Sequence, residues 1–210
     1  MEIQWLGHAC FLIENKQGGK LVCDPFDDRL GYPVPCVATD VVTISHGHFD
    51  HNHTAQLQGE FTVVDSIAPV ELAGFRIYGV DSFHDEQAGA QRGTNRIFVI
   101  EADGVRVAHL GDLGHILSDK QLAQIGPVDV LMLPVGGFYT IDPRQAHVIA
   151  TTINAGVTLP MHYRTDTWDN AQIEKVDAFL GLIDPSGKVT ARAKALALPT
   201  EARIVVMEMA

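Results

Sequence analysis

The stretch Ser45-His46-Gly47-His48-Phe49-Asp50-His51 places four side chains that can bind a metal within six residues. It directly follows residues 41–44 (Val-Val-Thr-Ile), a short β-branched run that predicts a buried strand. The four side chains therefore lie on a loop at the carboxyl end of a strand, where ligands bind in open α/β sheets. Three imidazoles and a carboxylate would be costly to bury without a cation, and a solvated polar loop has no need of them. We expect this loop to bind a divalent metal ion.

Three more candidate ligands, His84, Asp112 and His162, each lie just past the end of an apolar run that predicts a strand. Taken alone, each is a weak signal, since a single histidine more often makes a structural hydrogen bond. If the strands are neighbours in one core, however, their ends converge on the 46–51 loop. The combined set of five imidazoles and two carboxylates is too large for one tetrahedral zinc. It favours two metal ions that share a bridging carboxylate and a bridging water.

The remaining sequence predicts strands first and helices later. Apolar or alternating runs predict strands at residues 3–6, 10–14, 20–23, 61–64, 75–78, 96–101, 105–108, 128–133, 157–160 and 203–208. Caps and helical spacing predict helices at about residues 119–124, 142–154 and 170–183. Asp103-Gly104 between two of the strands predicts a tight hairpin. We expect a layered α/β protein, and because no linker or repeat marks a boundary, we treat residues 1–210 as one domain, with two separate domains as the alternative.

Composition excludes several classes of protein. The 210 residues are 46% hydrophobic and 20% charged, as in ordinary globular proteins, and the formal net charge of −11 argues against a nucleic-acid-binding face. No apolar run approaches the ~18 residues of a membrane span, and the first residues lack the pattern of a secretory signal. The three cysteines form no C-x-x-C pair, which favours free thiols in a reducing compartment. We therefore expect a cytoplasmic protein that acts on a small molecule and binds neither nucleic acid nor membrane; its oligomeric state cannot be read from the sequence.

In chain order, the candidate ligands resemble the metal motifs of the metallo-β-lactamase superfamily of metal-dependent hydrolases. Other segments are similar to small prokaryotic Zn-dependent hydrolases, a subgroup similar to ascorbate-6-phosphate lactonase and, more distantly, to the phospholipase D that releases N-acylethanolamines. These segments are Trp5-Leu6-Gly7-His8-Ala9, Asp24-Pro25, Gly111-Asp112, Pro134-Val135-Gly136-Gly137 and Pro160-Met161-His162-Tyr163. The resemblance extends over most of the chain. It implies a four-layer αββα sandwich with the metals at one edge of the two sheets.

The resemblance also implies a role for each ligand. The first metal would be held by His46, His48 and His84. The second would be held by Asp50, His51 and His162, with Asp112 bridging the two. Asp24 would support the site by a hydrogen bond to a ligand histidine, the alternative being a turn residue before Pro25.

His48 bears on the choice of metal. It stands where relatives that reduce oxygen at a di-iron site have a carboxylate. A nitrogen-rich ligand set favours zinc, with manganese or iron as alternatives.

The mechanism implied is hydrolysis by a hydroxide held between two cations ~3.5–4 Å apart. No Ser or Cys nucleophile is then needed, and the sequence has no G-x-S-x-G motif. Asp50 is expected to take up or return a proton while it remains a ligand. The leading hypothesis is a hydrolase of a small ester, lactone or phosphodiester. The alternative is a redox or non-catalytic metal-binding protein on the same fold, with di-iron oxygen chemistry.

Four residues outside the ligand set, Tyr163, Arg164, Tyr139 and His8, are further catalytic or substrate-binding candidates. Tyr163 and Arg164 directly follow His162, so we expect both near the metals, with Arg164 on an anionic group of the substrate. The alternative for Arg164 is a surface pair with Asp166. Tyr139 is a second candidate for lining the site.

The remaining histidines carry weaker expectations. His8 either approaches the site or caps the turn in which it lies, and His115 is a candidate for supporting the ligands. The others, His53, His109 and His147, are expected to be structural. Specificity is expected to lie in the loops 27–37 and 85–94, whose shape the sequence does not reveal.

Overall fold

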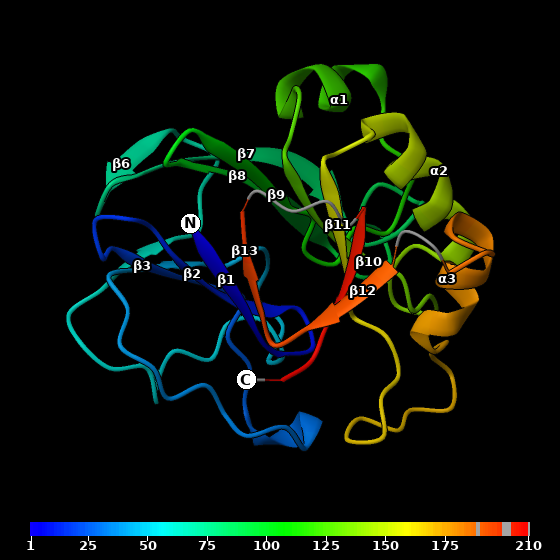
Figure 1. Cartoon of the computed structure of the whole chain (residues 1–210), viewed down its shortest axis with the longest axis horizontal. Helices are drawn as coiled ribbons and strands as arrows, with labels where there is room; N and C mark the ends of the chain where they lie inside the picture. Colours follow the sequence, from blue (N-terminus) through cyan, green and yellow to red (C-terminus); the bar gives the residue numbers. More distant parts are fainter. Residues whose placement is uncertain (188–189, 199–202, 210) are drawn as a thin grey trace.

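The strands form two sheets (Figure 1). The two sheets share one cluster of buried apolar side chains. The computed structural model describes residues 1–187, 190–198 and 203–209. The six-stranded sheet has the order β13 (Ala195–Ala197), β1 (Glu2–Gly7), β2 (Cys10–Glu14), β3 (Lys20–Cys23), β4 (Val41–Thr43), β5 (Thr62–Val64). The eight-stranded sheet has the order β12 (Thr190–Ala193), β14 (Ile204–Met207), β11 (Val157–Met161), β10 (Val130–Pro134), β9 (Val105–His109), β8 (Thr94–Ala102), β7 (Phe75–Phe83), β6 (Val70–Leu72). The layered α/β arrangement predicted from the sequence is confirmed.

The helices lie on the side of the eight-stranded sheet away from β1–β3 (Figure 1). Helix α1 (Asp119–Ile125) packs on β7, α2 (Pro143–Ile153) packs on β10, and α3 (Val176–Ile183) packs on α2. Ser118 and Asp142 cap α1 and α2 in capping boxes, which satisfy backbone N–H groups of the first turn. Over the six-stranded sheet, the described residues form loops and the short 3-10 helix η1 (Asp28–Leu30) in place of an α-helix. The helical layers of the αββα sandwich are therefore very unequal.

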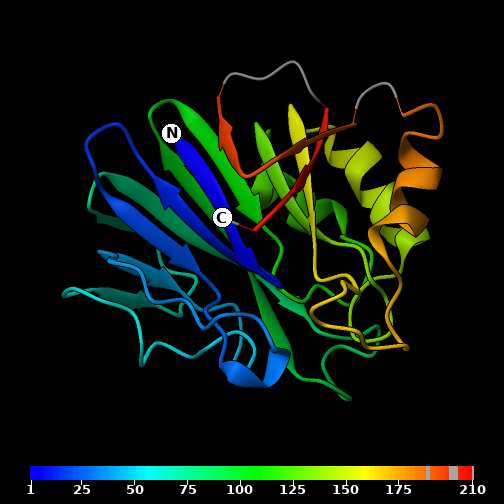
Figure 2. The same cartoon turned by 60° about the horizontal axis from the view of Figure 1, so that its bottom comes forward.

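The strand directions bring the predicted ligand segments to one edge. In the six-stranded sheet, β1, β3 and β4 run in the same direction, so that their carboxyl ends lie together. In the eight-stranded sheet, β7, β9, β10 and β11 share one direction in the same way. Figure 2 shows the two sheets side by side from a second direction. Every candidate ligand follows one of these carboxyl ends.

Two local predictions have different outcomes. The hairpin at Asp103-Gly104 is confirmed, since both residues have positive φ, 57° and 76°, as the tight turn requires. The helix predicted from residue 170 begins only at Val176. Asn170 instead closes a turn with Gln172 and Ile173, and the Glu174 N–H donates to the Gly136 carbonyl. Hydrogen bonds to a neighbouring loop thus replace the first helical turns.

Three short strands, β6, β12 and β13, were not predicted from the sequence. Cys10, Cys23 and Cys36 are free thiols, the first two buried. No helix among the described residues is long and apolar enough to cross a membrane.

Candidate metal centre

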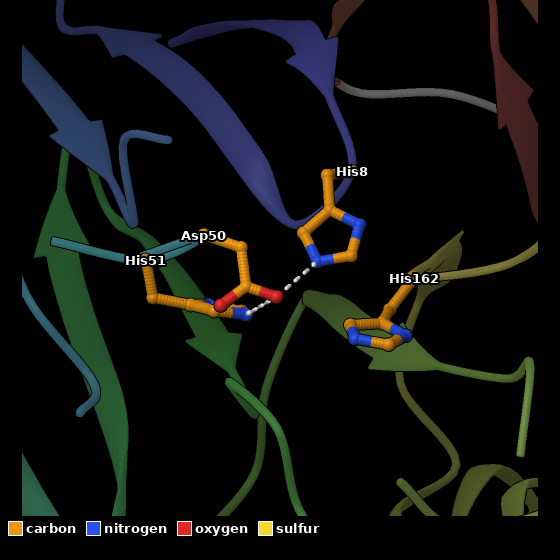
Figure 3. A group of neighbouring side chains, drawn as sticks. All are labelled: His8, Asp50, His51 and His162. Atoms are coloured by element: carbon orange, nitrogen blue, oxygen red, sulfur yellow. Dashed lines mark ion pairs between the residues drawn. The ribbon is translucent and has the colours of Figure 1, made fainter. Parts of the chain in front are cut away.

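The predicted ligands converge from both sheets into two groups of side chains. One group contains His46, His48 and His84, and the other contains His8, Asp50, His51 and His162. Within each group the potential ligand atoms lie within 4.8 Å of one another. The members of the second group point toward one another (Figure 3). The structure thus brings together both ligand triads that the family resemblance implies, and it adds His8 to the second.

Asp112 lies between the two groups. Its Oδ2 is 3.1 Å from Nε2 of His84 and 3.3 Å from Nε2 of His162. Its Oδ1 is 3.2 Å from Nε2 of His51. One carboxylate therefore faces ligands of both groups, as a bridging residue must.

Asp24 supports one ligand of each group. Its Oδ2 lies 2.8 Å from Nδ1 of His51 and also accepts a 2.5 Å hydrogen bond from the Ser45 hydroxyl. The same hydroxyl lies 2.9 Å from Nδ1 of His46. With Nδ1 held in this way, each ring turns Nε2 toward the site. Ser45 was not singled out in the sequence, although it begins the ligand motif.

Asn95 supports Asp112 from the eight-stranded sheet. Its side-chain amide donates to the Ser82 hydroxyl and to the Leu110 carbonyl, at 2.8 and 3.0 Å. Its Oδ1 accepts a 2.9 Å hydrogen bond from the Asp112 N–H. The side chain is fully buried, so this network fixes the backbone that carries the central carboxylate. The sequence does not indicate this role, because nothing in it marks an asparagine inside a strand as the partner of a distant aspartate.

The protonation states of most ligands suit a cation. Burial lowers the pKa of His46 to about 3, so the ring is neutral at neutral pH. Burial alone would raise the pKa of Asp112, but the neighbouring His162 and His51 hold it well below its usual range. The pKa of Asp50 is also lowered against the effect of its burial, mainly by its contact with His8. Neutral imidazoles and ionised carboxylates are the forms that bind metals.

His51 is the exception among the ligands. Although burial opposes it, the carboxylates of Asp112 and Asp24 raise the pKa of His51 well above its ordinary value. A cation that bound between these groups would therefore displace a proton.

Several buried polar atoms have no hydrogen-bond partner among the described residues. They include Nε2 of His46, Nε2 of His51 and Oδ1 of Asp112. Buried polar atoms are rarely left without a partner, because each carries a desolvation cost. The two imidazole nitrogens lie beside the Asp112 carboxylate, 3.9 Å from Oδ2 for His46 and 3.2 Å from Oδ1 for His51, where a metal ion would satisfy them. The residues present therefore fit a divalent metal.

A cavity of about 410 Å³ opens onto this cluster. Its wall includes Arg29, Phe49, Arg92, Tyr139 and Trp168, next to the ligand side chains. Tyr139 thus lines the site, as predicted. The other four were missed individually, although Arg29 and Arg92 belong to the two loops predicted to carry specificity.

The two arginines of the cavity differ in their partners. Arg29 lies over the Phe49 ring, 3.7 Å from its centre, and is paired with Asp27. The Arg92 guanidinium lies about 6 Å from the ring centres of Phe138 and Tyr139, at 6.0 and 5.8 Å. Among the described residues, Arg92 has no carboxylate within ion-pair distance. Its charge is available to a ligand in the cavity.

Tyr163 and Arg164 do not lie where the sequence led us to expect. The Tyr163 ring is buried and stacks on Trp5 with ring centres 5.9 Å apart, and neither residue lines the cavity. His162 has a φ of 50°, a left-handed conformation that turns the chain directly after the ligand. The alternative, a pair of Arg164 with Asp166, is not found among the described residues either, where Asp166 lies 3.7 Å from Lys175.

Two further histidines make structural contacts. His109 is buried, and its Nε2 lies 2.8 Å from the Ala9 carbonyl, which agrees with the structural role predicted for it. Nε2 of His115 accepts a 3.2 Å hydrogen bond from the Phe83 N–H, the residue before ligand His84. His115 therefore supports the backbone next to the site.

Comparisons with known proteins agree with this geometry. A sequence model of the β-lactamase superfamily domain matches residues 2–162. A Thermotoga maritima protein, proposed to be a Zn-dependent hydrolase of the metallo-β-lactamase superfamily, has a crystal structure with 42% identity and a TM-score of 0.83; the match covers 100% of this chain and 99% of that one.

Two relatives are named UPF0173 metal-dependent hydrolases. The relative from Methanoculleus marisnigri is 34% identical over 79% of this chain and 82% of its own length. The relative from Methanoregula boonei is 32% identical over 80% of this chain and 84% of its own length.

Proposed function

Since this chain belongs to the metallo-β-lactamase superfamily and is a metal-dependent hydrolase of it, we propose that it works with two divalent metal ions. The first would be held by the group of His46, His48 and His84. The second would be held by Asp50, His51 and His162. The observation that carries this proposal is the position of Asp112, whose two oxygens face histidines of both groups at 3.1–3.3 Å.

Zinc is the metal we propose. The ligand set contains five imidazoles and two carboxylates. Zinc is commonly bound by imidazole-rich sites, whereas oxygen-rich sites suit harder cations. Manganese and iron accept the same ligands and are the alternatives that metal analysis must separate. Bound divalent cations lower the pKa of a coordinated water to near 7 and polarise the bond to be cleaved, which provides a nucleophile at neutral pH.

The protein's own groups would position and neutralise the substrate. We propose a small ester, lactone or phosphodiester that carries an anionic group, because the guanidinium of Arg92 lies at the cavity wall without an ion-pair partner in the part of the chain that the structure describes. The aromatic rings of Phe49, Tyr139 and Trp168 would exclude water from one side of the substrate. Asp50, whose Oδ2 is 3.5 Å from Nε2 of His8, is placed to hold a proton during turnover.

We further propose that the 210 residues form one domain and that the protein is cytoplasmic. The shared cluster of buried side chains between the sheets supports the first point. The net charge of −11 supports a small-molecule substrate and opposes binding to nucleic acid.

The experiment that tests this function is metal analysis joined to a substrate screen. Protein purified without chelators is expected to contain two zinc ions per chain and to hydrolyse members of a panel of lactones, esters and phosphodiesters. Anionic members should be preferred over their neutral analogues, and Arg92→Ala should remove that preference. Bound iron together with oxygen consumption would support the redox alternative and contradict the hydrolase. A protein that binds no metal would contradict both.

A further inference from the structure

His8 is a buried histidine in a strained backbone conformation. It follows β1 and has a φ of 52°, a region that side chains other than glycine rarely occupy. Its side chain is 1% exposed. Backbone strain of this kind persists only where the surrounding structure enforces it, and it is concentrated at functional sites.

The surroundings of His8 tie it to the second ligand group. Its carbonyl accepts a 2.9 Å hydrogen bond from the Trp5 indole and a 3.3 Å hydrogen bond from the N–H of ligand His162. Its ring lies 4.2 Å from the His162 ring and 4.5 Å from the Trp168 ring, measured between ring centres. The backbone and the ring of His8 are therefore both fixed against this ligand group.

The ring nitrogens of His8 are unsatisfied. Nδ1 and Nε2 are both buried and have no hydrogen-bond partner among the described residues. Nε2 faces Asp50, 3.5 Å from its Oδ2 (Figure 3). A ligand atom of His8 lies within 4.8 Å of those of Asp50, His51 and His162. A role in packing alone would be served by an apolar side chain, which would avoid the cost of burying two nitrogens that make no hydrogen bond within the described residues.

We propose that His8 is a fourth protein ligand of the second metal, beside Asp50, His51 and His162. This inference rests on the two-metal function proposed above. It makes the two sites unequal, because the first has three histidines and the second has three histidines and a carboxylate, with Asp112 shared. The second metal is then the more tightly bound of the two.

The test is the zinc affinity of the purified protein, titrated in competition with a chromophoric chelator. The main variant is His8→Gly, which removes the imidazole and also relieves the strained φ, so folding is favoured. His8→Asn is the second variant, since asparagine tolerates the left-handed region. Each should weaken one of the two zinc sites by more than the ~10–100-fold typical of losing a supporting residue, and leave the other unchanged.

Cobalt substitution distinguishes a ligand from a residue that only positions Asp50. In His8→Gly saturated with Co²⁺, the visible absorption spectrum should change, and free imidazole should restore both the spectrum and the lost affinity. Trp168→Leu is the matched control, because it removes packing against His8 without removing a ligand atom; its cobalt spectrum should match that of the wild type.

Three results have separate meanings. A folded His8→Gly protein with two unchanged affinities would overturn the inference. Weaker affinity with an unchanged cobalt spectrum would also overturn it, because His8 would then only support a ligand. A wild-type protein that binds fewer than two metals would instead contradict the proposed function.

Discussion

The two sheets contribute to the metal centre in different ways. The six-stranded sheet supplies four of the proposed ligands in one loop after β4. Its neighbouring strand β3 is followed by Asp24, which holds His51 directly and His46 through the Ser45 hydroxyl. The eight-stranded sheet supplies His84, Asp112 and His162 singly, from the ends of three strands. Their relative positions depend on the register of β7, β9 and β11 rather than on a local motif.

The site on the six-stranded sheet is organised by a local sequence motif, whereas that on the eight-stranded sheet is organised by tertiary structure. The loop after β4 can present its imidazoles together because they are close in sequence, and because two of them, His46 and His51, share the Asp24–Ser45 network. On the eight-stranded sheet, the position of the central residue Asp112 depends on its backbone. Asn95 fixes that backbone by accepting a hydrogen bond from the Asp112 N–H. Mutations on the two sheets should therefore affect metal binding and stability in different ways.

The largest expected effect is that of Asp112→Asn. The amide keeps the shape of the side chain but removes the charge that faces both ligand groups. Both metals should bind more weakly together, and hydrolysis should fall by more than the ~10–100-fold expected for a supporting residue. Metal content by mass spectrometry checks this; loss of a single ion, with the other at full occupancy, would show that Asp112 is not a bridge.

His48→Ala should have the next largest effect, and on one metal only. His48 is the exposed member of the first group, so its truncation leaves no cavity in the core. The first metal and most of the activity should be lost, while the melting temperature of metal-free protein stays unchanged. Two retained metals with full turnover would remove His48 from the site.

The features that the sequence predicts are those marked by a local pattern, and the features that it misses are those placed by tertiary structure. The loop after β4 is recognisable because its ligands are contiguous, and His84, Asp112 and His162 are recognisable because each follows an apolar run. Arg92 and Trp168 were missed because loops place them, and nothing local marks their approach to the metals.

The elements missed from the sequence have physical reasons. The segment 190–197 is rich in alanine, which has low strand propensity, so β12 and β13 form through pairing with β14 and β1. Apolar spacing predicts a helix from residue 170, whereas α3 begins at Val176, because the spacing does not show that Glu174 is hydrogen-bonded to Gly136. Tyr163 was misplaced for a similar reason, since the left-handed turn at His162 is a tertiary feature.

A smaller effect should distinguish Asp24, which supports the loop after β4, from Asn95, which supports Asp112 on the eight-stranded sheet. Asp24→Asn should weaken metal binding by about 10–100-fold, because it frees the rings of His51 and His46. Asn95→Ala should mainly cost stability, about 1–3 kcal/mol, because it leaves buried partners unsatisfied. Chemical denaturation of metal-free protein and zinc titration of both variants would measure this; identical profiles for the two would contradict the distinction.

The smallest predicted effect is a loss of stability when an ion pair distant from the metals is removed from either sheet. On the eight-stranded sheet, Glu101 contacts Arg76 and Arg106, and although burial opposes it, these arginines lower the pKa of Glu101 below its ordinary value of 4.5. Because the folded-state pKa is lowered, the stabilisation is present above that ordinary value and is lost as pH falls through the folded pKa. Glu101→Gln should cost about 0.5–1 kcal/mol at pH 7 and little in strong acid.

The exposed pair on the six-stranded sheet is the matched control. Glu14 and Lys20 are 3.5 Å apart, and Glu14→Gln should cost less than Glu101→Gln at pH 7. Thermal melts of metal-free protein across pH give both values. Equal losses would show that the second arginine on Glu101 adds nothing.

The most direct test of the account is anomalous diffraction from a crystal of the zinc-loaded protein, collected at the zinc absorption edge. Two peaks ~3.5–4 Å apart are expected, one beside His46, His48 and His84 and one beside Asp50, His51 and His162, with Asp112 contacting both. A single peak, or two peaks that Asp112 does not bridge, would contradict the two-metal centre.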